Sequence, residues 1–224
     1  MDKTKTLQLL ADKGEQFKKY FDLLIEWNEK INLTAITQFD EVMTKHFEDS
    51  ISGESLVPQG AKLCDVGTGA GFPGVPLKIV RDDVQLTLMD SLNKRINFLQ
   101  TVSDNLGLDA RCIHTRAEDA GKGAHREQFD VVTARAVARL NTLCEYCLPL
   151  VKVGGKFLAY KALVDEELAE SQKAIKILGG KVEDIVRFDL SNGDSRSIVV
   201  ISKISPTPNK YPRGKGKERS APIV

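Results

Sequence analysis

The stretch KLCDVGTGAGFPGVPLKIV, from Lys62 to Val80, decides the fold class of this 224-residue chain. It begins with a short apolar run, passes through four glycines and two prolines, and ends in an apolar run with helical spacing. Glycine tolerates backbone conformations and close approaches that other residues resist. The order strand, glycine loop and helix therefore predicts the first unit of an α/β sheet, with a ligand lying against the loop.

The sequence after this stretch repeats the alternation of strand and helix. Its strand-like runs are almost continuously apolar, which is typical of parallel strands buried on both faces. The last two runs, KVEDIVRFDL and SRSIVVISKI, are joined through Asn192-Gly193, which is a hairpin signal. We therefore expect an α/β fold with a mostly parallel seven-stranded sheet and an antiparallel last strand. This is the class I (Rossmann-like) methyltransferase variant of the dinucleotide-binding fold.

Composition and periodicity divide the chain into three segments. Residues 1–57 have apolar side chains at positions 17, 20, 21, 24, 27 and 31, and they predict an N-terminal helical extension. Residues 58–203 hold the alternating strands and helices of the methyltransferase domain. Residues 204–224 are rich in proline, glycine and lysine, and they predict a basic C-terminal tail, either flexible or partly docked.

Bulk properties exclude several classes of protein. The chain is 42% hydrophobic and has a formal net charge of +1, so any nucleic-acid surface must be a local patch. No apolar run reaches the ~20 residues of a membrane span, and the N-terminus has no signal-peptide core. The four cysteines include one C-x-x-C, without a second pair or a histidine at ligand spacing. We expect a cytoplasmic monomer with no membrane partner and no metal.

Two overlapping glycine patterns compete within the loop. Gly69-x-Gly71-x-x-Gly74 matches a dinucleotide fingerprint, whereas Asp65 with the glycines at 67, 69 and 71 matches the D-x-G-x-G-x-G of methyl-donor sites. A dinucleotide would place its pyrophosphate at the helix N-terminus. Pro73 offers no N–H there, and the Asp65 carboxylate would repel the phosphates. The cationic donor S-adenosylmethionine removes both conflicts, and it is the cofactor that the loop predicts.

Further donor contacts fall at the ends of later strands. Asp90 ends the run VQLTLMD and could accept hydrogen bonds from both ribose hydroxyls. NAD enzymes bind ribose with the same kind of carboxylate, so Asp90 alone does not distinguish the two ligands. Ala117 and Glu118 follow the third strand and could meet the adenine edge. Together with the loop, these residues predict a donor site made of Asp65, Gly67, Gly69, Asp90, Ala117 and Glu118.

The segment FDVVTARAVARL, around the end of the fourth strand, bears on the acceptor. It lacks the Asn-Pro-Pro-Tyr expected of adenine-N6 enzymes, and it contains no nucleophilic cysteine. Arg135 lies there instead, and arginine is a poor general base because it stays protonated. This favours an acceptor that needs no deprotonation, such as N7 of guanine, with catalysis by positioning. The sequence leaves open whether Arg135 contacts the donor, the base or a phosphate.

Several motifs, taken in this order, resemble one known family. They are WNEKINLTAI (27–36), HFEDSI (46–51), DVGTGAGFPGVPLKI (65–79), LMDSLNKRINFL (88–99), ARAVARL (134–140) and YPRGKGKERSAPIV (211–224). Nearly the whole chain is similar to the ribosomal RNA small subunit methyltransferase G family, also called glucose-inhibited division protein B. The resemblance implies a class I methyltransferase with an N-terminal helical extension that methylates N7 of one guanine in 16S ribosomal RNA.

The resemblance also implies particular site residues. Matching motifs place donor contacts at Gly67, Phe72, Ala117, Glu118 and Arg135. The partner would be 16S ribosomal RNA or the small ribosomal subunit, with RNA-binding candidates at His46, Lys94, Arg95, Arg213 and Lys215. Two alternatives stay open at this point: a small-molecule methyltransferase, and a non-catalytic RNA-binding or assembly factor on the same fold.

Overall fold

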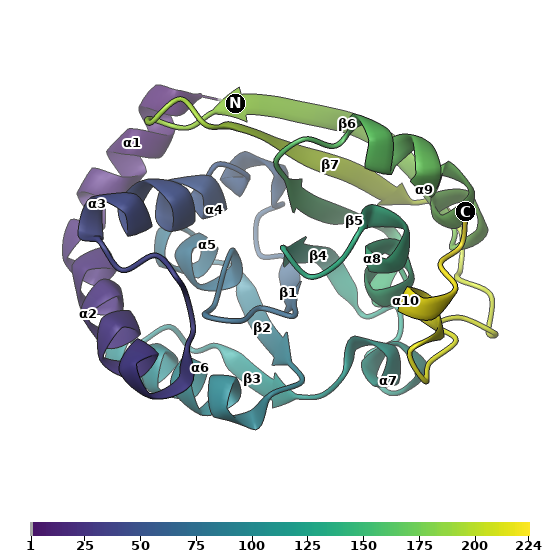
Figure 1. Cartoon of the computed structure of the whole chain (residues 1–224), viewed down its shortest axis with the longest axis horizontal. Coiled ribbons are helices and arrows are strands. Elements are labelled where there is room, and N and C mark those ends of the chain that lie inside the picture. The colour runs from purple at the N-terminus through teal and green to yellow at the C-terminus, as the bar shows by residue number, and fades with distance from the viewer. Residues whose placement is uncertain (1) are drawn as a thin grey trace.

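The computed structural model describes residues 2–224, and a seven-stranded sheet forms its centre (Figure 1). The strand order is β3-β2-β1-β4-β5-β7-β6. Strands β1 to β5 pair in parallel, and β7 is antiparallel to both β5 and β6. The strands are β1 (Lys62–Val66), β2 (Gln85–Asp90), β3 (Arg111–His114), β4 (Phe129–Arg135), β5 (Val151–Lys161), β6 (Gly180–Asp189) and β7 (Ser195–Lys203). The predicted mostly parallel sheet with a reversed last strand is confirmed.

The turn between β6 and β7 forms at Asn192 and Gly193, as the sequence predicts. Gly193 has a φ of +86°, a conformation that favours glycine. The backbone N–H of Leu190 donates to the carbonyl of Asp194 at 3.0 Å and closes the hairpin. The reversed strand β7 thereby lies inside the sheet, between β5 and β6.

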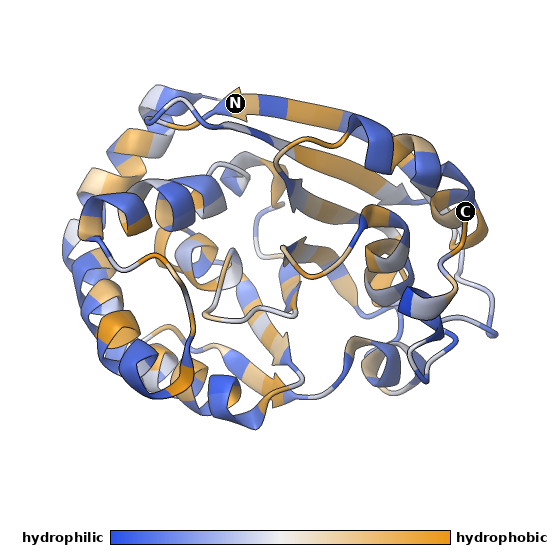
Figure 2. Ribbon diagram, viewed as in Figure 1, coloured by the Kyte–Doolittle hydropathy of each residue, from blue (hydrophilic) through white to orange (hydrophobic). Residues whose placement is uncertain are grey.

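Helices cover both faces of the sheet, and on each face a hydrophobic core lies between the sheet and its helices. One core lies beneath α1, α2, α5 and α6, and the other beneath α7, α8 and α9. Figure 2 shows apolar residues along the strands and polar residues on many outward helix surfaces. The helices are α1 (Lys3–Asp12), α2 (Gly14–Ile31), α3 (Phe39–Val42), α4 (Asp49–Ile51), α5 (Gly74–Val80), α6 (Asn93–Leu106), α7 (Ala117–Lys122), α8 (Leu140–Cys147), α9 (Asp165–Ile177) and α10 (Lys217–Ser220). Among residues 2–224, no helix combines the length and apolar character needed to span a membrane.

The N-terminal extension packs directly on the glycine loop. The predicted apolar stripe of α2 is confirmed, because Phe17 and Tyr20 are fully buried. Phe47 belongs to a π-helix, Met43–Glu48, that joins α3 to α4, and such segments are frequent at functional sites. The ring of Tyr20 stacks on Phe47 at 5.2 Å and lies 5.7 Å from that of Phe72 in the loop. The extension is therefore part of the scaffold that positions the loop.

The C-terminal tail is docked against α7 and α8. Tyr211 and Pro212 are buried, and α10 contacts α8. Arg213 donates four hydrogen bonds to the carboxylate of Glu145, at 2.7–3.2 Å, from its backbone N–H and its guanidinium group. Of the two states that the sequence left open for the tail, the docked state is the one observed.

Candidate active site

A cavity of about 340 Å³ opens above the carboxyl ends of β1, β2 and β3. Ligands of parallel α/β sheets bind at this edge, near the point where the strand order reverses. We call it the donor cavity, because it brings together four residues of the predicted donor site: Gly67, Asp90, Ala117 and Glu118. The other lining residues are Val66, Met89, Ser91, Thr115, Arg116, Val137, Tyr146, Gly216 and Arg219.

A larger hollow, of about 680 Å³, lies at the opposite edge of the sheet. Its lining includes the first residues of four strands, Lys62, Gln85, Arg111 and Phe129. None of the predicted donor or RNA-binding residues reaches it. Because the amino ends of parallel strands are not where these folds bind their ligands, size alone does not make it the active site.

The glycine loop owes its shape to three glycines with positive φ, of which Gly71 has a φ of +100°. Gly67 and Gly69 have φ values of +63° and +61°. A Cβ atom on Gly67 would lie 2.7 Å from Cγ2 of Val137, whereas one on Gly69 would meet nothing closer than 4.0 Å. Glycine is therefore required at 69 for its backbone conformation, and at 67 also for the close approach of Val137.

Asp65 lies beneath the loop and does not face the donor cavity. Its fully buried carboxylate accepts hydrogen bonds from Oγ1 of Thr68 at 2.6 Å, Oγ1 of Thr133 at 3.0 Å and the N–H of Gly74 at 3.0 Å. Burial raises the pKa of Asp65 to about 6, although these bonds and the charge of Arg135 oppose that shift. Asp65 does not line the donor cavity, and its predicted contact with the donor stays a prediction. Its side chain positions the loop and the start of α5.

Asp90 lies at the donor cavity with both carboxylate oxygens already engaged. Oδ2 accepts from the N–H of Gly69 at 3.0 Å and from Nη1 of Arg95 at 3.2 Å, and Oδ1 accepts from the N–H of Leu92 at 2.9 Å. A carboxylate has about four acceptor sites, so it can still accept from a ligand. The ribose contact at Asp90 stays a prediction.

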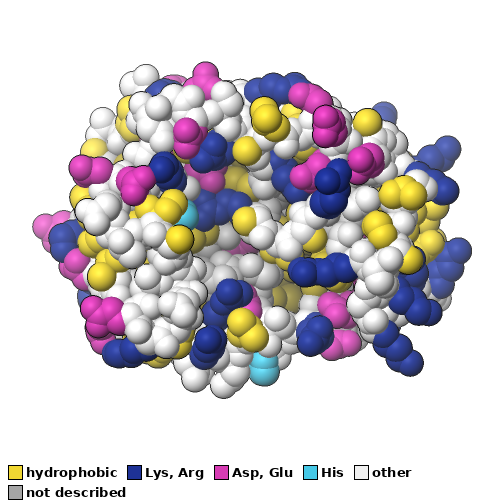
Figure 3. All heavy atoms as spheres, in the orientation of Figure 1, with side chains coloured by type: hydrophobic (Ala, Val, Ile, Leu, Met, Phe, Trp, Pro, Cys, Tyr) yellow, Lys and Arg dark blue, Asp and Glu magenta, His cyan; other side chains and the backbone are white. Residues whose placement is uncertain are grey.

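A second cavity, of about 410 Å³, adjoins the first across the end of β4. Ala136 lines this second cavity, and the next residue, Val137, lines the donor cavity. Ala136 has a φ of +57°, which is uncommon for a residue with a side chain and recurs at functional sites. Four of its lining residues are cations and one, Asp49, is an anion; the lining consists of Ile36, Lys45, His46, Asp49, Arg135, Ala136, Tyr160, Lys161, Ala162 and Arg196. We call it the acceptor cavity; Figure 3 shows Lys and Arg side chains gathered around the hollowed centre of this face.

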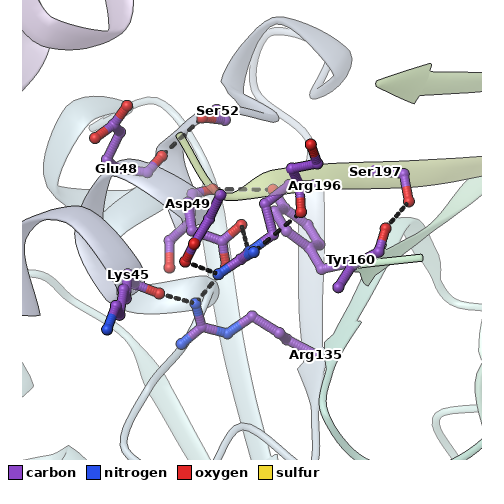
Figure 4. Close-up of polar contacts among 12 residues, drawn as sticks. Lys45, Glu48, Asp49, Ser52, Arg135, Tyr160, Arg196 and Ser197 are labelled. Carbon is purple, nitrogen blue, oxygen red and sulfur yellow. Dashed lines mark hydrogen bonds and ion pairs between the residues drawn. The ribbon is translucent and has the colours of Figure 1, made fainter. Parts of the chain in front are cut away.

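Arg135 is held in the acceptor cavity by the N-terminal extension (Figure 4). Its Nη1 donates to Oδ2 of Asp49 at 2.6 Å and to the carbonyl of Lys45 at 3.2 Å. The other carboxylate oxygen of Asp49 lies 3.7 Å from Nε of Arg196 on β7. Arg135 lines the acceptor cavity and not the donor cavity, so of the contacts that the sequence left open the structure favours one with the acceptor.

The ring of Phe72 packs against both Arg135 and His46. Its ring centroid lies 4.9 Å from the guanidinium carbon of Arg135 and 4.6 Å from the imidazole centroid of His46. The side chain is buried and lines neither cavity. The side chain packs against two residues of the acceptor cavity, and the contact of Phe72 with the donor stays a prediction.

His46 is neutral, and both of its ring nitrogens have polar neighbours. Nδ1 lies 3.2 Å from Nη2 of Arg135 and 3.1 Å from the carbonyl of Lys45, and Nε2 lies 2.9 Å from Oγ1 of Thr34. The guanidinium group can only donate and the carbonyl can only accept, so the two neighbours of Nδ1 favour opposite tautomers. Burial, followed by the charge of Arg135, lowers the pKa of His46 to about 4.

We expect the free energy of unfolding to fall at acid pH because of His46. Its pKa falls on folding from 6.5 to about 4, so the unfolded state binds this proton more readily. The stabilisation that neutral His46 gives to the folded state is complete above pH 6.5. As the pH falls toward 4, the free energy of unfolding decreases by up to about 3 kcal/mol. Urea unfolding of the wild type and of His46→Gln between pH 4 and 8 measures the effect. The variant should lose this part of the pH dependence, and equal pH profiles would contradict the assignment.

Comparison with known proteins identifies the family. The model of the rRNA small subunit methyltransferase G family matches residues 13–199. The chain belongs to this family. It is 51% identical to Ribosomal RNA small subunit methyltransferase G of Streptococcus sanguinis, over 96% of this chain and 97% of that protein. It is 50% identical to the Listeria monocytogenes protein of the same name, over 98% of this chain and 94% of that protein.

A solved structure shows the same fold. A SAM-dependent methyltransferase from Aquifex aeolicus matches with a TM-score of 0.53 at 18% identity, over 70% of this chain and 89% of that chain. At this identity the likeness concerns the fold alone. It confirms the class I methyltransferase architecture that the sequence predicts.

In this member of the methyltransferase G family, three of the predicted RNA-binding residues lie around the donor cavity. Lys94 is exposed at the start of α6, beside Arg95, whose guanidinium group pairs with Asp90. Lys215 is exposed on the tail, next to Gly216 in the cavity wall. Their contact with RNA stays a prediction.

Arg213 does not belong to this exposed group. It pairs with Glu145, whose side chain is 1% exposed, and it is the cation that compensates this buried charge. Nε and Nη2 of its guanidinium group are engaged with Glu145, and the contact of Arg213 with RNA stays a prediction. It anchors the tail, and through the tail it supports Gly216 and Arg219 in the donor cavity.

Replacing Arg213 with alanine should loosen the tail. The buried carboxylate of Glu145 would lose its partner, and we expect a loss of about 2–3 kcal/mol in the free energy of unfolding. The affinity for S-adenosylmethionine should fall too, because the tail forms part of the donor cavity. Lys215→Ala is the matched control, since Lys215 is exposed. Thermal unfolding and calorimetry measure both quantities, and equal behaviour of the two variants would contradict the anchoring role.

The sequence did not single out several residues that line the cavities. Val137 and Tyr146 follow β4, and Gly216 comes from the C-terminal tail, which the sequence marked as basic and as the motif YPRGKGKERSAPIV. Asp49 and Arg196 belong to segments far apart in the chain, and only HFEDSI, which contains Asp49, had been noted as a motif. Within residues 2–224, no three His, Cys, Asp or Glu side chains are grouped so as to hold a metal ion.

Proposed function

We propose that the protein transfers the methyl group of S-adenosylmethionine to N7 of a guanine in 16S ribosomal RNA. The observation that carries this proposal is the pair of adjoining cavities on either side of Ala136 and Val137. Methyl transfer requires donor and acceptor to be held next to each other in a fixed orientation. Family membership supports ribosomal RNA as the acceptor, since the relatives are named for it.

The residues of the donor cavity fit S-adenosylmethionine. Asp90 and Glu118 offer carboxylates to hydroxyl and amine groups, and Val66 and Met89 offer apolar surface to a purine ring. Gly67 lets the backbone of the loop come close to the ligand. The donor, when bound, supplies an electrophilic methyl group on a cationic sulfur, which the two carboxylates favour electrostatically.

No side chain of the acceptor cavity has to take a proton from the substrate. N7 of guanine carries a lone pair and no hydrogen. Both ring nitrogens of His46 already have polar neighbours, and Arg135 itself stays protonated. The chain's contribution is therefore to position the base and to exclude water, which agrees with an acceptor that needs no general base.

The cations around the cavities support RNA over a small-molecule acceptor. Lys94 lies at the start of α6 and Lys215 on the tail, both beside the donor cavity, while Lys45 and Arg196 line the acceptor cavity. Such a spread of cations suits a polyanion that is larger than one cavity, and its binding would weaken with salt. We infer that the protein works as a cytoplasmic monomer on 16S ribosomal RNA or on the small subunit.

Small ribosomal subunits that lack N7 methylation test the proposal. Incubation with S-adenosylmethionine labelled on its methyl group should place label in 16S ribosomal RNA, and mapping should locate it at N7 of one guanine. Subunits that already carry the methyl group are the control and should take up none. Donor binding without transfer to RNA would point to the non-catalytic assembly factor, and label on another atom would overturn the choice of N7.

A further inference from the structure

Asp49 is the one carboxylate among the residues that line the acceptor cavity in the described part of the chain. Its side chain is 6% exposed. Oδ2 accepts from Nη1 of Arg135 at 2.6 Å. Oδ1 accepts no hydrogen bond from residues 2–224, and its nearest cation is Nε of Arg196, at 3.7 Å. A carboxylate with a free acceptor oxygen therefore faces a cavity that otherwise presents cations (Figure 4).

Guanine is the base whose chemistry fits such a carboxylate. Its Watson–Crick edge presents two donors side by side, N1–H and the N2 amino group, and O6 as an acceptor. Enzymes that act on an extruded base commonly read this edge by hydrogen bonds. A carboxylate accepts from both guanine donors, and an arginine can donate to O6. Adenine presents an unprotonated N1 at the same place, which a carboxylate would repel.

We propose that Asp49 selects guanine by accepting hydrogen bonds from N1–H and the N2 amino group of the target base. Arg196 lies on the same side and donates to O6. N7 lies on the far side of the purine from N1, so this orientation leaves it free to face the donor cavity. The inference rests on the proposed function, and it adds the residue that selects guanine as the target base.

Asp49 also balances the charge that the reaction creates. The N7 lone pair forms the new bond to the methyl carbon, the carbon–sulfur pair stays with sulfur, and the positive charge passes from sulfur to the purine. N1–H becomes a stronger donor as this charge develops, so its bond to Asp49 strengthens toward the transition state. Arg135 and Arg196 alone would oppose a cationic base. Loss of the carboxylate should therefore lower kcat more than it raises KM.

The test pairs Asp49→Asn with inosine, which lacks only the N2 amino group of guanosine and keeps N7. Reconstituted small subunits carry guanosine or inosine at the target position. The wild type should prefer guanosine by about 10-fold in kcat/KM, the scale of a lost base contact. Asp49→Asn should lower kcat by about 100-fold and reduce the preference for guanosine to about 2-fold or less.

Asp194→Asn is the matched control. Asp194 also pairs with Arg196, at 3.2 Å, but it does not line the acceptor cavity. This variant should keep the full preference for guanosine, and calorimetry with S-adenosylmethionine shows which variants are folded and bind the donor.

An Asp49→Asn enzyme that keeps the wild-type preference would overturn the inference. So would a wild type that methylates inosine as well as guanosine, which decides the matter even if Asp49→Asn does not fold. Failure of the proposed function looks different, because then the wild type would transfer no methyl group to N7 of either base.

Discussion

Replacing Gly67 with alanine should abolish donor binding and leave the protein folded. The added Cβ atom would lie 2.7 Å from Cγ2 of Val137, so the loop or Val137 has to move. Both line the donor cavity, and the cavity therefore changes shape wherever the strain is relieved. We expect Kd for S-adenosylmethionine to rise by about 100-fold or more, which is about 3 kcal/mol of binding free energy. Calorimetry on the folded variant measures it.

Gly60→Ala is the matched control for this prediction. Gly60 has a φ of +67°, close to the +63° of Gly67, but no atom lies within 4 Å of its added Cβ. Both variants carry the same cost of a left-handed alanine, about 1–2 kcal/mol, so their difference isolates the collision with Val137. The double variant Gly67→Ala with Val137→Ala should recover much of the affinity. Equal donor affinity of Gly67→Ala and Gly60→Ala would show that the loop does not touch the donor at this point.

The order of strands and helices could be predicted because each element is encoded locally. The glycines of 67–74, the apolar strands and the Asn192-Gly193 turn are signals that act within a few residues. The side chain of Asp65 could not be placed in the same way. Strand β1 is buried on both faces, so apolar periodicity does not tell which way a polar residue at its end points. The position of Asp65 at the end of a strand suggested that it contacts the ligand. In the structure, its carboxylate points toward Thr68 and Thr133 instead.

The pairs that build the acceptor cavity and dock the tail are long-range. Asp49 and Arg135 are 86 residues apart, and Glu145 and Arg213 are 68 residues apart. In the sequence, each member of such a pair looks like an ordinary charged residue, because no pattern within a few residues indicates its partner. This explains why the pairing of Arg213 with Glu145 could not be predicted, while Arg135 could be singled out because it ends a recognisable strand.

Replacing Arg135 with lysine should remove most of the activity, even though the charge is kept. Nη1 of the guanidinium group donates to Asp49 and to the Lys45 carbonyl, Nη2 lies 3.2 Å from Nδ1 of His46, and the guanidinium carbon lies 4.9 Å from the centroid of the Phe72 ring. A lysine ammonium is a compact charge without this planar fork, so it cannot make all of these contacts together. We expect kcat/KM to fall by about 100- to 1,000-fold, on the scale of losing one preorganised donor in an active site. Single-turnover methylation of small subunits measures the change.

Arg187→Lys separates this effect from the general cost of exchanging arginine for lysine. Arg187 pairs with Asp165 at 2.6 Å, the distance found between Arg135 and Asp49, but both partners are more than half exposed. That variant should keep its activity and change the free energy of unfolding by less than about 1 kcal/mol. Arg135→Lys should lose about 2–3 kcal/mol, because Asp49 is buried and keeps only the more distant Arg196 at 3.7 Å. An Arg135→Lys enzyme that loses stability but keeps its kcat/KM would show that Arg135 only holds the N-terminal extension against β4. Loss of kcat/KM in enzyme that is still folded and binds the donor with wild-type affinity would place the guanidinium group at the acceptor.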